Sequence, residues 1–589
     1  MIYFIAIWTL LAVICWVIGT AVLNALNAPE GTSWRLRAIA ALWLGTIILA
    51  IALLSASLAL PLSPLVGGAV AFGGAGIALL SAPTREELKA LKARLSPAFL
   101  LGYFAIAALV AALMVKQVTW FDTGLYHFGS IRWMEKYGAV PGLALINSKF
   151  GFISSWFALA APLNPESLGS HVTAVTNGFV LLLAIFQLGA SLARIIKGEG
   201  NIADGLSVIF LAIAIFLMRF TTFMSAISIS PSPDIPVIIL TGMIAWTMLL
   251  IASYDTASLF TANLRTDARA IPLILATGAV TIKLSALPLL CIAWLFYLFD
   301  EPHKIAANSD SEPLPQLGKA NALKRAIKGS AIAGVLLLPM VLVGLVTSGC
   351  PLYPSTLMCF NFSWSISIAT TVAERTAING WMSWFDPPPA GENQWFWLLK
   401  EWWNLANFNK VMIVAIVLSI AIAIYLFKTI RFNEIRPFIW LFALSGSGIV
   451  YIMTQAPLIR FGLGYFIAIP ALLLAIVSDK LSHQFPVKLT RNFKNIFLND
   501  RMRWLGLLLV SVAIVGILRN DLRENLFIPP ELPREEVFEE KVNDIDYFIP
   551  ADPPKCWAAT LPCAPEEISK NVRLRNPDRG LDAGFVNRK

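Results

Sequence analysis

The chain has 589 residues, of which 57% are hydrophobic and 14% are charged, and its mean hydropathy is +0.71. Soluble domains carry about 25% charged residues, so this composition excludes an ordinary soluble domain. The formal net charge of +9 arises from basic residues that cluster in short loops. Such clusters are typical of the cytoplasmic loops of membrane proteins, and they do not indicate a nucleic-acid partner.

Apolar runs of about 17 to 25 residues, each long enough to cross about 30 Å of hydrocarbon, recur along the chain. They predict an all-α polytopic membrane protein with about 12–14 transmembrane or re-entrant helices. The first run is long and lacks a basic leader, so we expect a retained span and not a cleaved signal. The spans are expected near residues 2–24, 38–58, 61–82, 98–115, 171–192, 203–220, 235–253, 329–347, 410–427, 437–453, 462–478 and 504–518.

Charge alternation predicts the topology of these spans. The loop after the third span is rich in Arg and Lys, which places it in the cytoplasm. Counting crossings from there puts two long polar segments, residues 116–170 and 348–409, on the outer side. The same count places the C-terminal segment, residues 519–589, outside. We therefore divide the chain into a membrane domain, residues 1–518, and a small extracytoplasmic tail.

Residues 271–299 must cross the membrane an even number of times, because the loops on both sides are basic. About 29 residues are too few for two full spans. We expect two short half-helices that meet at residues 281–285, with Lys283 at the tip of a re-entrant hairpin. A lysine that snorkels from one continuous helix is the alternative, and it would break the alternation. A cation at membrane depth needs an anionic partner and marks a functional hypothesis.

The first outer segment carries more chemistry than a simple reversal of direction needs. Asp122 precedes a helix-like run that ends at Gly138, which is placed as a C-terminal cap. Asp122 has two compatible interpretations, a helix N-cap or a general base held at the membrane surface. His127 either belongs to the same site or packs at the interface.

Further charges reach the outer side on separate loops or helix ends. They are Asp234, which also suits an N-cap, Lys283 and Arg460. Acids and cations among aromatics suit a lipid-linked phosphosugar, whose phosphate binds Arg or Lys and whose acceptor hydroxyl needs a base. Trp156 and the tryptophans between residues 381 and 403 either stack on a sugar or form an aromatic belt. Composition alone does not separate this from a transporter site.

Four cysteines form two close pairs in polar segments on the expected outer side. The pairs are Cys350 with Cys359 and Cys556 with Cys563. Disulfides form outside the reducing cytoplasm, so each pair is a candidate disulfide. Neither spacing fits a zinc motif, and no histidine accompanies the pairs. No metal site and no cofactor is predicted.

Several motifs together resemble a known family. Asp122 opens a large outer loop soon after a transmembrane helix, a Ser-Pro-Asp sequence ends at Asp234, and a Lys-x-Ser-Ala-Leu-Pro-Leu element begins at Lys283. With the many spans, these features resemble GT-C membrane glycosyltransferases. The nearest members are bacterial relatives of protein mannosyltransferases and of lipid A sugar transferases, which use polyprenyl-phosphate sugars. The resemblance covers roughly residues 98–480.

The sequence Trp-Phe-Asp-Thr-Gly-Leu-Tyr-His at residues 120–127 is similar to the signature of one bacterial branch of such proteins. A Ser-Ser-Trp motif, a Gly-x-Pro-Leu-x-Pro-Ser segment and a Cys-Trp-x(5)-Cys motif also recur in that branch. Here they occupy residues 154–156, 349–355 and 556–563.

The resemblance implies that Asp122 is the catalytic base and that Lys283 and Arg460 hold the lipid phosphate. Many family members carry a second acid in the first loop, whereas Thr123 follows Asp122 here. This departure argues against the metal dependence seen in oligosaccharyltransferases.

We therefore expect a glycosyltransferase that moves a sugar from a polyprenyl-phosphate donor to a glycan, lipid or protein acceptor. The reaction is expected at the outer face of the cytoplasmic membrane, with Asp122 as general base and the two cations neutralising the departing phosphate. A transporter or flippase of a lipid-linked saccharide would share the aromatics and cations but need no base. A polymerase or ligase of surface polysaccharide is a third alternative.

Overall fold

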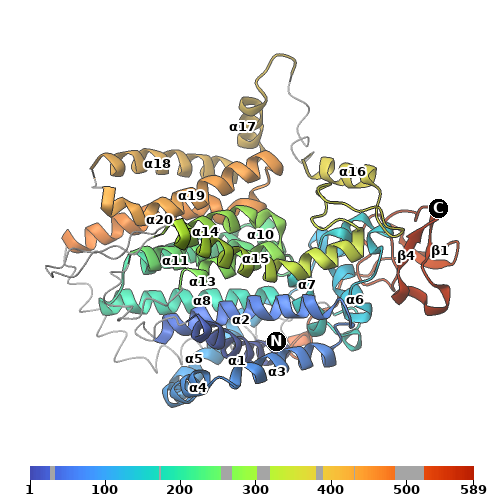
Figure 1. The fold of residues 1–589 in the computed structure, drawn as a ribbon, viewed down its shortest axis with the longest axis horizontal. Coiled ribbons are helices and arrows are strands. Elements are labelled where there is room, and N and C mark those ends of the chain that lie inside the picture. The colour runs from blue at the N-terminus through green and yellow to red at the C-terminus, as the bar shows by residue number, and fades with distance from the viewer. Residues whose placement is uncertain are drawn as a thin grey trace.

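The computed structural model places long helices side by side in one bundle, with a small β-containing cap at one end (Figure 1). Ten of the described helices are long and apolar enough to cross a membrane, or up to eleven if a bent pair counts as one more span. The chain is therefore an all-α polytopic membrane protein. The structure describes residues 1–26, 34–171, 174–253, 268–300, 319–379, 389–429, 432–484 and 523–588.

The long helices agree closely with the expected spans. The last expected span, residues 504–518, lies outside the described residues, as do Trp381 and Trp384. The ten long helices are α1 (Ile2–Ala25), α2 (Trp34–Ala56), α5 (Pro97–Met114), α8 (Val175–Lys197), α9 (Ile202–Phe220), α11 (Asp234–Ser253), α15 (Lys319–Ser348), α18 (Asn407–Thr429), α19 (Phe432–Gln455) and α20 (Ile459–Gln484).

The third expected span is a shorter helix, α3 (Pro64–Leu79), followed by a bend of 100° into α4 (Ala82–Arg94). The basic segment that we expected as a cytoplasmic loop is therefore helical. Its Glu, Lys, Leu and Ala residues are strong helix formers, which explains the difference. Glu87 of α4 accepts a hydrogen bond of 2.8 Å from Arg37, and this ion pair fastens α4 to the start of α2.

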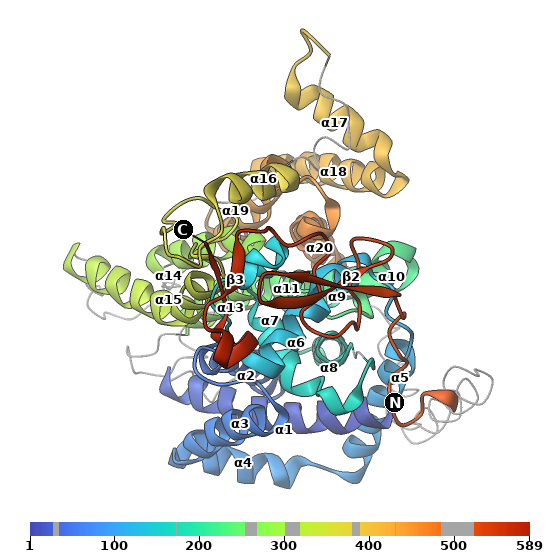
Figure 2. The ribbon, with the colours of Figure 1, turned by 90° about the vertical axis from the view of Figure 1, so that its right-hand side faces the viewer.

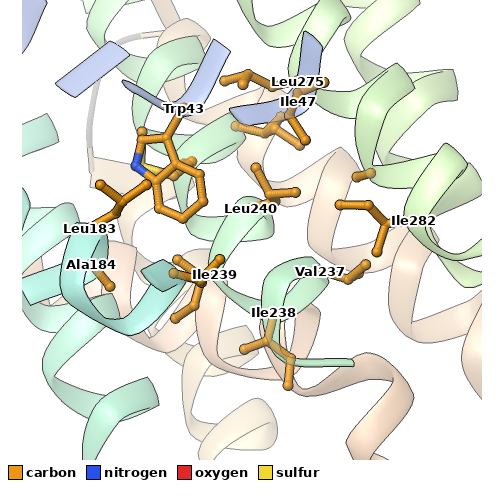
Figure 3. Packing of buried hydrophobic residues seen from close by; sticks show 14 of the residues in the cluster. Trp43, Ile47, Leu183, Ala184, Val237, Ile238, Ile239, Leu240, Leu275 and Ile282 are labelled. Carbon is orange, nitrogen blue, oxygen red and sulfur yellow. The ribbon is translucent and has the colours of Figure 1, made fainter. Parts of the chain in front are cut away.

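Helix α11 lies at the centre of the bundle. Figure 3 shows its residues Ile239 and Leu240 among side chains from α2, α8 and α13. Gly278 of α13 lets this helix approach α2 closely, because a Cβ at this position would lie 2.1 Å from Ile47. Small residues at such crossings are typical of membrane helix packing. The tight core fixes the first residue of α11, which is Asp234.

A broken helix pair, α13 (Ala270–Ile282) and α14 (Leu287–Phe299), follows this core. Lys283 has extended backbone angles and separates the two helices. Arg269 donates a hydrogen bond of 2.6 Å to the carbonyl oxygen of Asp300, so the two helix ends far from Lys283 lie together. Each helix is about 20 Å long, too short to cross the hydrocarbon alone. The predicted hairpin with Lys283 at its tip is confirmed.

Three polar regions gather at one end of the bundle, called here the capped end, which faces the viewer in Figure 2. They are residues 116–170, residues 348–379 and the tail, residues 523–588. The tail and the first segment share a hydrophobic core that includes Trp133 and Phe585. The backbone N–H of Asn587 in the tail donates 2.8 Å to the carbonyl oxygen of Ser363. Charge alternation predicts that residues 116–170, 348–409 and 519–589 share one side, and the regions named here agree with that prediction.

The tail contains strands that the sequence analysis did not predict. They form two small antiparallel sheets, β1 with β2 and β3 with β4. The strands are β1 (Val537–Val542), β2 (Ile545–Pro550), β3 (Val572–Leu574) and β4 (Phe585–Asn587). Further short helices include η1 (Thr123–His127), α6 (Phe128–Tyr137), α7 (Ser155–Ala160), α10 (Thr222–Ser228), α16 (Ile368–Asn379) and α17 (Gln394–Leu405).

Candidate functional site

Four charged side chains from separate elements meet at the capped end. Asp122 precedes η1, Asp234 begins α11, Lys283 forms the hairpin tip and Arg460 lies in the first turn of α20. Arg460 Nη1 donates to Asp122 Oδ2 at 2.7 Å and lies 3.9 Å from Asp234 Oδ2. Lys283 Nζ donates to Asp234 Oδ1. Two carboxylates and two cations thus form one linked network, called here the four-charge cluster.

The four side chains of the cluster differ in their exposure to solvent. The side chains of Asp234 and Arg460 are 3% and 8% exposed, whereas those of Asp122 and Lys283 are 19% and 24% exposed. Buried charges are tolerated only when they are paired, and here each acid faces a cation. Asp122 and Lys283 are therefore the members most open to a ligand, and Arg460 is less open but not fully closed.

Two aromatic rings flank the cations. The guanidinium carbon of Arg460 lies 5.0 Å from the ring centre of Trp120 and 4.6 Å from that of Phe461. Lys283 Nζ lies 3.8 Å from the ring centre of Phe461, which therefore contacts both cations. No sequence motif predicts a role for Phe461. Its position directly after Arg460 is the only local signal that could have indicated one.

Several hydrogen-bond donors on or near the cluster residues have no partner among the described residues. They are the indole N–H of Trp120, the Ser285 hydroxyl and Nε of Arg460, all buried. Buried polar groups in folded proteins are nearly always paired. Donors left free beside two cations suit a ligand with several acceptor oxygens, such as a phosphate.

The turn that carries Asp122 is π-helical, a rare geometry found frequently at functional sites. The carboxylate of Asp122 makes no capping hydrogen bond and points to Arg460 instead, so the N-cap interpretation is wrong. The helical run ends as predicted. Gly138 has a φ of 74°, and its backbone N–H donates to the carbonyl oxygen of Met134 at 3.1 Å. Its role as C-terminal cap is therefore confirmed.

The neighbours of Asp122 determine its charge state. Burial raises the pKa of the Asp122 carboxyl, but the charges of Arg460 and Lys283 and the Arg460 hydrogen bond lower it more. The net pKa lies below the ordinary value for aspartate. Asp122 is therefore ionised at neutral pH, but its basicity is held down while Arg460 remains paired with it.

His127 lies at the edge of the cluster and is 1% exposed. Its ring contacts Tyr126 at 4.5 Å and Phe157 at 5.3 Å between ring centres, and its Nδ1 has no hydrogen-bond partner within the described part of the chain. Burial lowers the pKa of His127 to about 4, despite the opposing effect of Asp122. His127 is therefore neutral at neutral pH.

Trp156 occupies a structural position. It is 1% exposed, and its indole N–H donates to Asn177 Oδ1 at 2.8 Å. Asn177 Nδ2 in turn donates to the carbonyl oxygens of Ser230 at 2.6 Å and Ser232 at 3.1 Å. Trp156 thus orders the turn before Asp234 and presents no open face on which a sugar could stack.

The segment of residues 116–170 also holds the hairpin tip. The Ser154 hydroxyl donates 2.8 Å to the carbonyl oxygen of Ile282, and the hydroxyls of Ser155 and Thr281 lie 2.9 Å apart. The Ser-Ser-Trp motif of the sequence analysis therefore positions both Lys283, through the tip, and Asp234, through Trp156.

Both candidate cysteine pairs are joined in the structure, Cys350 to Cys359 and Cys556 to Cys563. Both bridges lie at the capped end. Among the described residues, no group of three or more His, Cys, Asp or Glu side chains is arranged to hold a metal ion.

These features define a polytopic membrane protein. Two carboxylates and two cations form a cluster without net charge beneath the cap at one end of its helix bundle. Residues 1–309 and 313–467 match the family described as "Domain of unknown function (DUF8201)", and the chain belongs to this family. All four members of the cluster lie within the matched residues. No curated protein and no solved structure gives a significant match.

Proposed function

We propose that this chain is a membrane glycosyltransferase of the GT-C type. It transfers a sugar from a polyprenyl-phosphate donor to an acceptor at the outer face of the cytoplasmic membrane. One observation carries the proposal. The partly exposed carboxylate of Asp122 lies 2.7 Å from Arg460, in a cluster whose cations and unpartnered donors suit a phosphate.

The cations act on the leaving group. As the bond between the sugar and the phosphate breaks, its electron pair passes to the phosphate oxygen. Arg460 and Lys283 stabilise the charge that develops there, and the free indole N–H of Trp120 adds a hydrogen bond. Because these groups are fixed before the donor arrives, they need little rearrangement during the reaction.

Asp122 acts on the acceptor. In the unliganded protein Arg460 lowers the pKa of the Asp122 carboxyl. When the donor phosphate takes hydrogen bonds from Arg460, Asp122 loses much of this pairing and becomes a stronger base. The acceptor oxygen then attacks the sugar carbon while its proton passes to Asp122. Donor binding and activation of the base are coupled through one arginine.

The outward orientation of the site rests on two arguments. Both disulfides lie at the capped end, and disulfides persist outside the reducing cytoplasm. The basic helix α4 is fastened to Arg37 at the start of α2, whereas Ser57, just after α2, packs against the capped end at Gly138. Basic segments favour the cytoplasmic side. Both arguments support an outward orientation of the capped end.

Purified protein in liposomes, supplied with a polyprenyl-phosphate sugar and an envelope extract as acceptor, tests the proposal. We expect Asp122→Asn to bind donor but to lose about 10²- to 10⁴-fold in turnover. Glu166→Gln is the matched control, because Glu166 is an exposed acid of the same outer segment that pairs with Arg132 at 3.3 Å. Transfer by Asp122→Asn at the wild-type rate would contradict the assignment of the base.

A transporter or flippase of a lipid-linked saccharide is the second candidate. The break at Lys283 favours it, because transporters commonly bind substrates where membrane helices are interrupted. Such a protein needs no general base. It would move the lipid-linked saccharide across the liposome membrane and yield no glycosyl product with either the wild type or Asp122→Asn.

A further inference from the structure

The C-terminal segment is an integral part of the capped end. Leu532 donates its backbone N–H to the carbonyl oxygen of Ser170 at 2.8 Å, and Phe585 donates to that of Pro141 at 2.8 Å. Buried side chains of the tail, such as Tyr547, share a core with the first outer segment. The fold of the segment that carries Asp122 therefore depends on the tail.

One tail residue contacts the turn of Asp122 directly. The backbone N–H of Trp557 donates to the carbonyl oxygen of Gly124 at 3.1 Å. The indole lies against Gly124 so closely that a Cβ on this residue would come within 2.7 Å of the ring. Trp557 is 6% exposed and packs with Val118 and Phe128 on either side of the turn. Glycine at position 124 is what admits the indole.

A disulfide closes the loop that presents Trp557. Cys556 precedes Trp557 directly and is bonded to Cys563. Trp557 has a φ of 42°, a left-handed conformation that residues with a side chain adopt rarely. The loop is also fastened to β2, where Phe548 donates its N–H to the carbonyl oxygen of Pro562 at 3.0 Å. The closed loop holds Trp557 in a conformation that an open chain would relax.

The turn beneath Trp557 needs such support. A π-helical turn is intrinsically less favourable than an α-helical one, and the Asp122 side chain makes no capping hydrogen bond to it. Conversion of the turn to α-helix would shift the register by one residue and rotate Asp122 by about 100°. Arg460 holds the carboxylate on the bundle side. Trp557 covers the turn at Gly124.

We propose that Trp557, locked by the Cys556–Cys563 disulfide, is a positioning residue for Asp122, and that reduction of this disulfide releases the turn. The proposal deepens the proposed function, on which it rests only for the role of Asp122 as a base. The contact between tail and turn would exist whatever reaction the site performs.

Hydrogen–deuterium exchange of the full-length protein tests the contact without reference to activity. We expect the peptide covering residues 120–128 to exchange faster in Trp557→Ala than in the wild type, and Trp557→Phe to recover part of the protection. Trp395→Ala is the matched control, because Trp395 is 51% exposed on α17. Unchanged exchange of this peptide in Trp557→Ala would overturn the proposal.

Hydrogen–deuterium exchange of the reduced, folded protein tests the same contact without a substitution at Trp557. Because a reductant would open both disulfides of the wild type, the measurement uses a variant in which Cys350 and Cys359 are both serine. We expect reduction of this variant to accelerate exchange at residues 120–128. Equal protection in its oxidised and reduced forms would overturn the role of the Cys556–Cys563 bridge.

Transfer kinetics then connect the contact to the proposed reaction. We expect Trp557→Ala to lower kcat by about 10²-fold, the loss typical of a misplaced catalytic group, with little change in the KM for the donor. Trp557→Phe should restore part of kcat. If no form of the protein yields a glycosyl product, the proposed function fails, while the exchange result still decides whether Trp557 holds the turn.

Discussion

Replacement of Asp234 by asparagine is predicted to destabilise the protein strongly. The side chain of Asp234 is 3% exposed and is the hydrogen-bond partner of Lys283, and it also lies 3.9 Å from Arg460. Asp234→Asn would leave two cations facing the single carboxylate of Asp122. Removal of one partner from a buried ion pair costs about 3–5 kcal/mol. Lys283 can turn partly toward solvent, so we expect about 3 kcal/mol.

A double variant separates the charge effect from a loss of packing. Lys283→Met combined with Asp234→Asn removes both charges and restores neutrality, so stability should return to within about 1 kcal/mol of the wild type. The exposed pair of Lys541 with Asp546, 2.8 Å apart, is the control. Asp546→Asn should leave stability nearly unchanged, because exposed ion pairs contribute little.

Denaturant unfolding in detergent micelles, followed by tryptophan fluorescence, measures these variants side by side. The reasoning predicts a large loss for Asp234→Asn, recovery in the double variant and a small loss for Asp546→Asn. It is refuted if Asp234→Asn is as stable as Asp546→Asn, or if the double variant is no more stable than the single one.

Three further predictions concern acid stability, the bridge and the topology. Because the pKa of His127 is lowered from 6.5 to about 4, the unfolded chain binds a proton that the native protein does not. The contribution of His127 to stability should therefore fall by on the order of 3 kcal/mol as the pH drops from 6.5 to 4, a loss that His127→Gln should lack in acid unfolding. Non-reducing peptide mapping should recover Cys556 bonded to Cys563, and two free thiols there would argue against export of the tail. In whole cells, a cysteine placed at Asp546 should react with an impermeant reagent while one at Lys89 should not, and strong labelling at both positions would contradict the topology.

The hairpin and the convergence of charges were predictable from the sequence. The length of residues 271–299 and the basic loops on both sides favour a hairpin with Lys283 at its tip over one continuous helix, which would break the charge alternation. Charges delivered to membrane depth must find opposite charges, so the meeting of Asp122, Asp234, Lys283 and Arg460 follows from general electrostatics.

The identity of the partners was not predictable. Asp122 and Arg460 are separated by 338 positions, and nothing local indicates that they pair. The contact of Trp557 with Gly124 is equally remote in sequence. Trp156 was assigned two interpretations because a tryptophan near the interface has the same local signature whether it packs or binds. Strand β1 was missed because its side chains are mostly exposed and do not alternate clearly.

The proposed reaction is tested most directly by mass spectrometry of lipid-linked donors and surface glycans. The comparison is between cells that carry the wild-type protein and cells that carry Asp122→Asn at equal abundance. The account predicts that the Asp122→Asn cells lose one sugar from a surface glycan, lipid or protein and accumulate the corresponding polyprenyl-phosphate sugar. Identical glycans and identical donor levels in the two strains would contradict it.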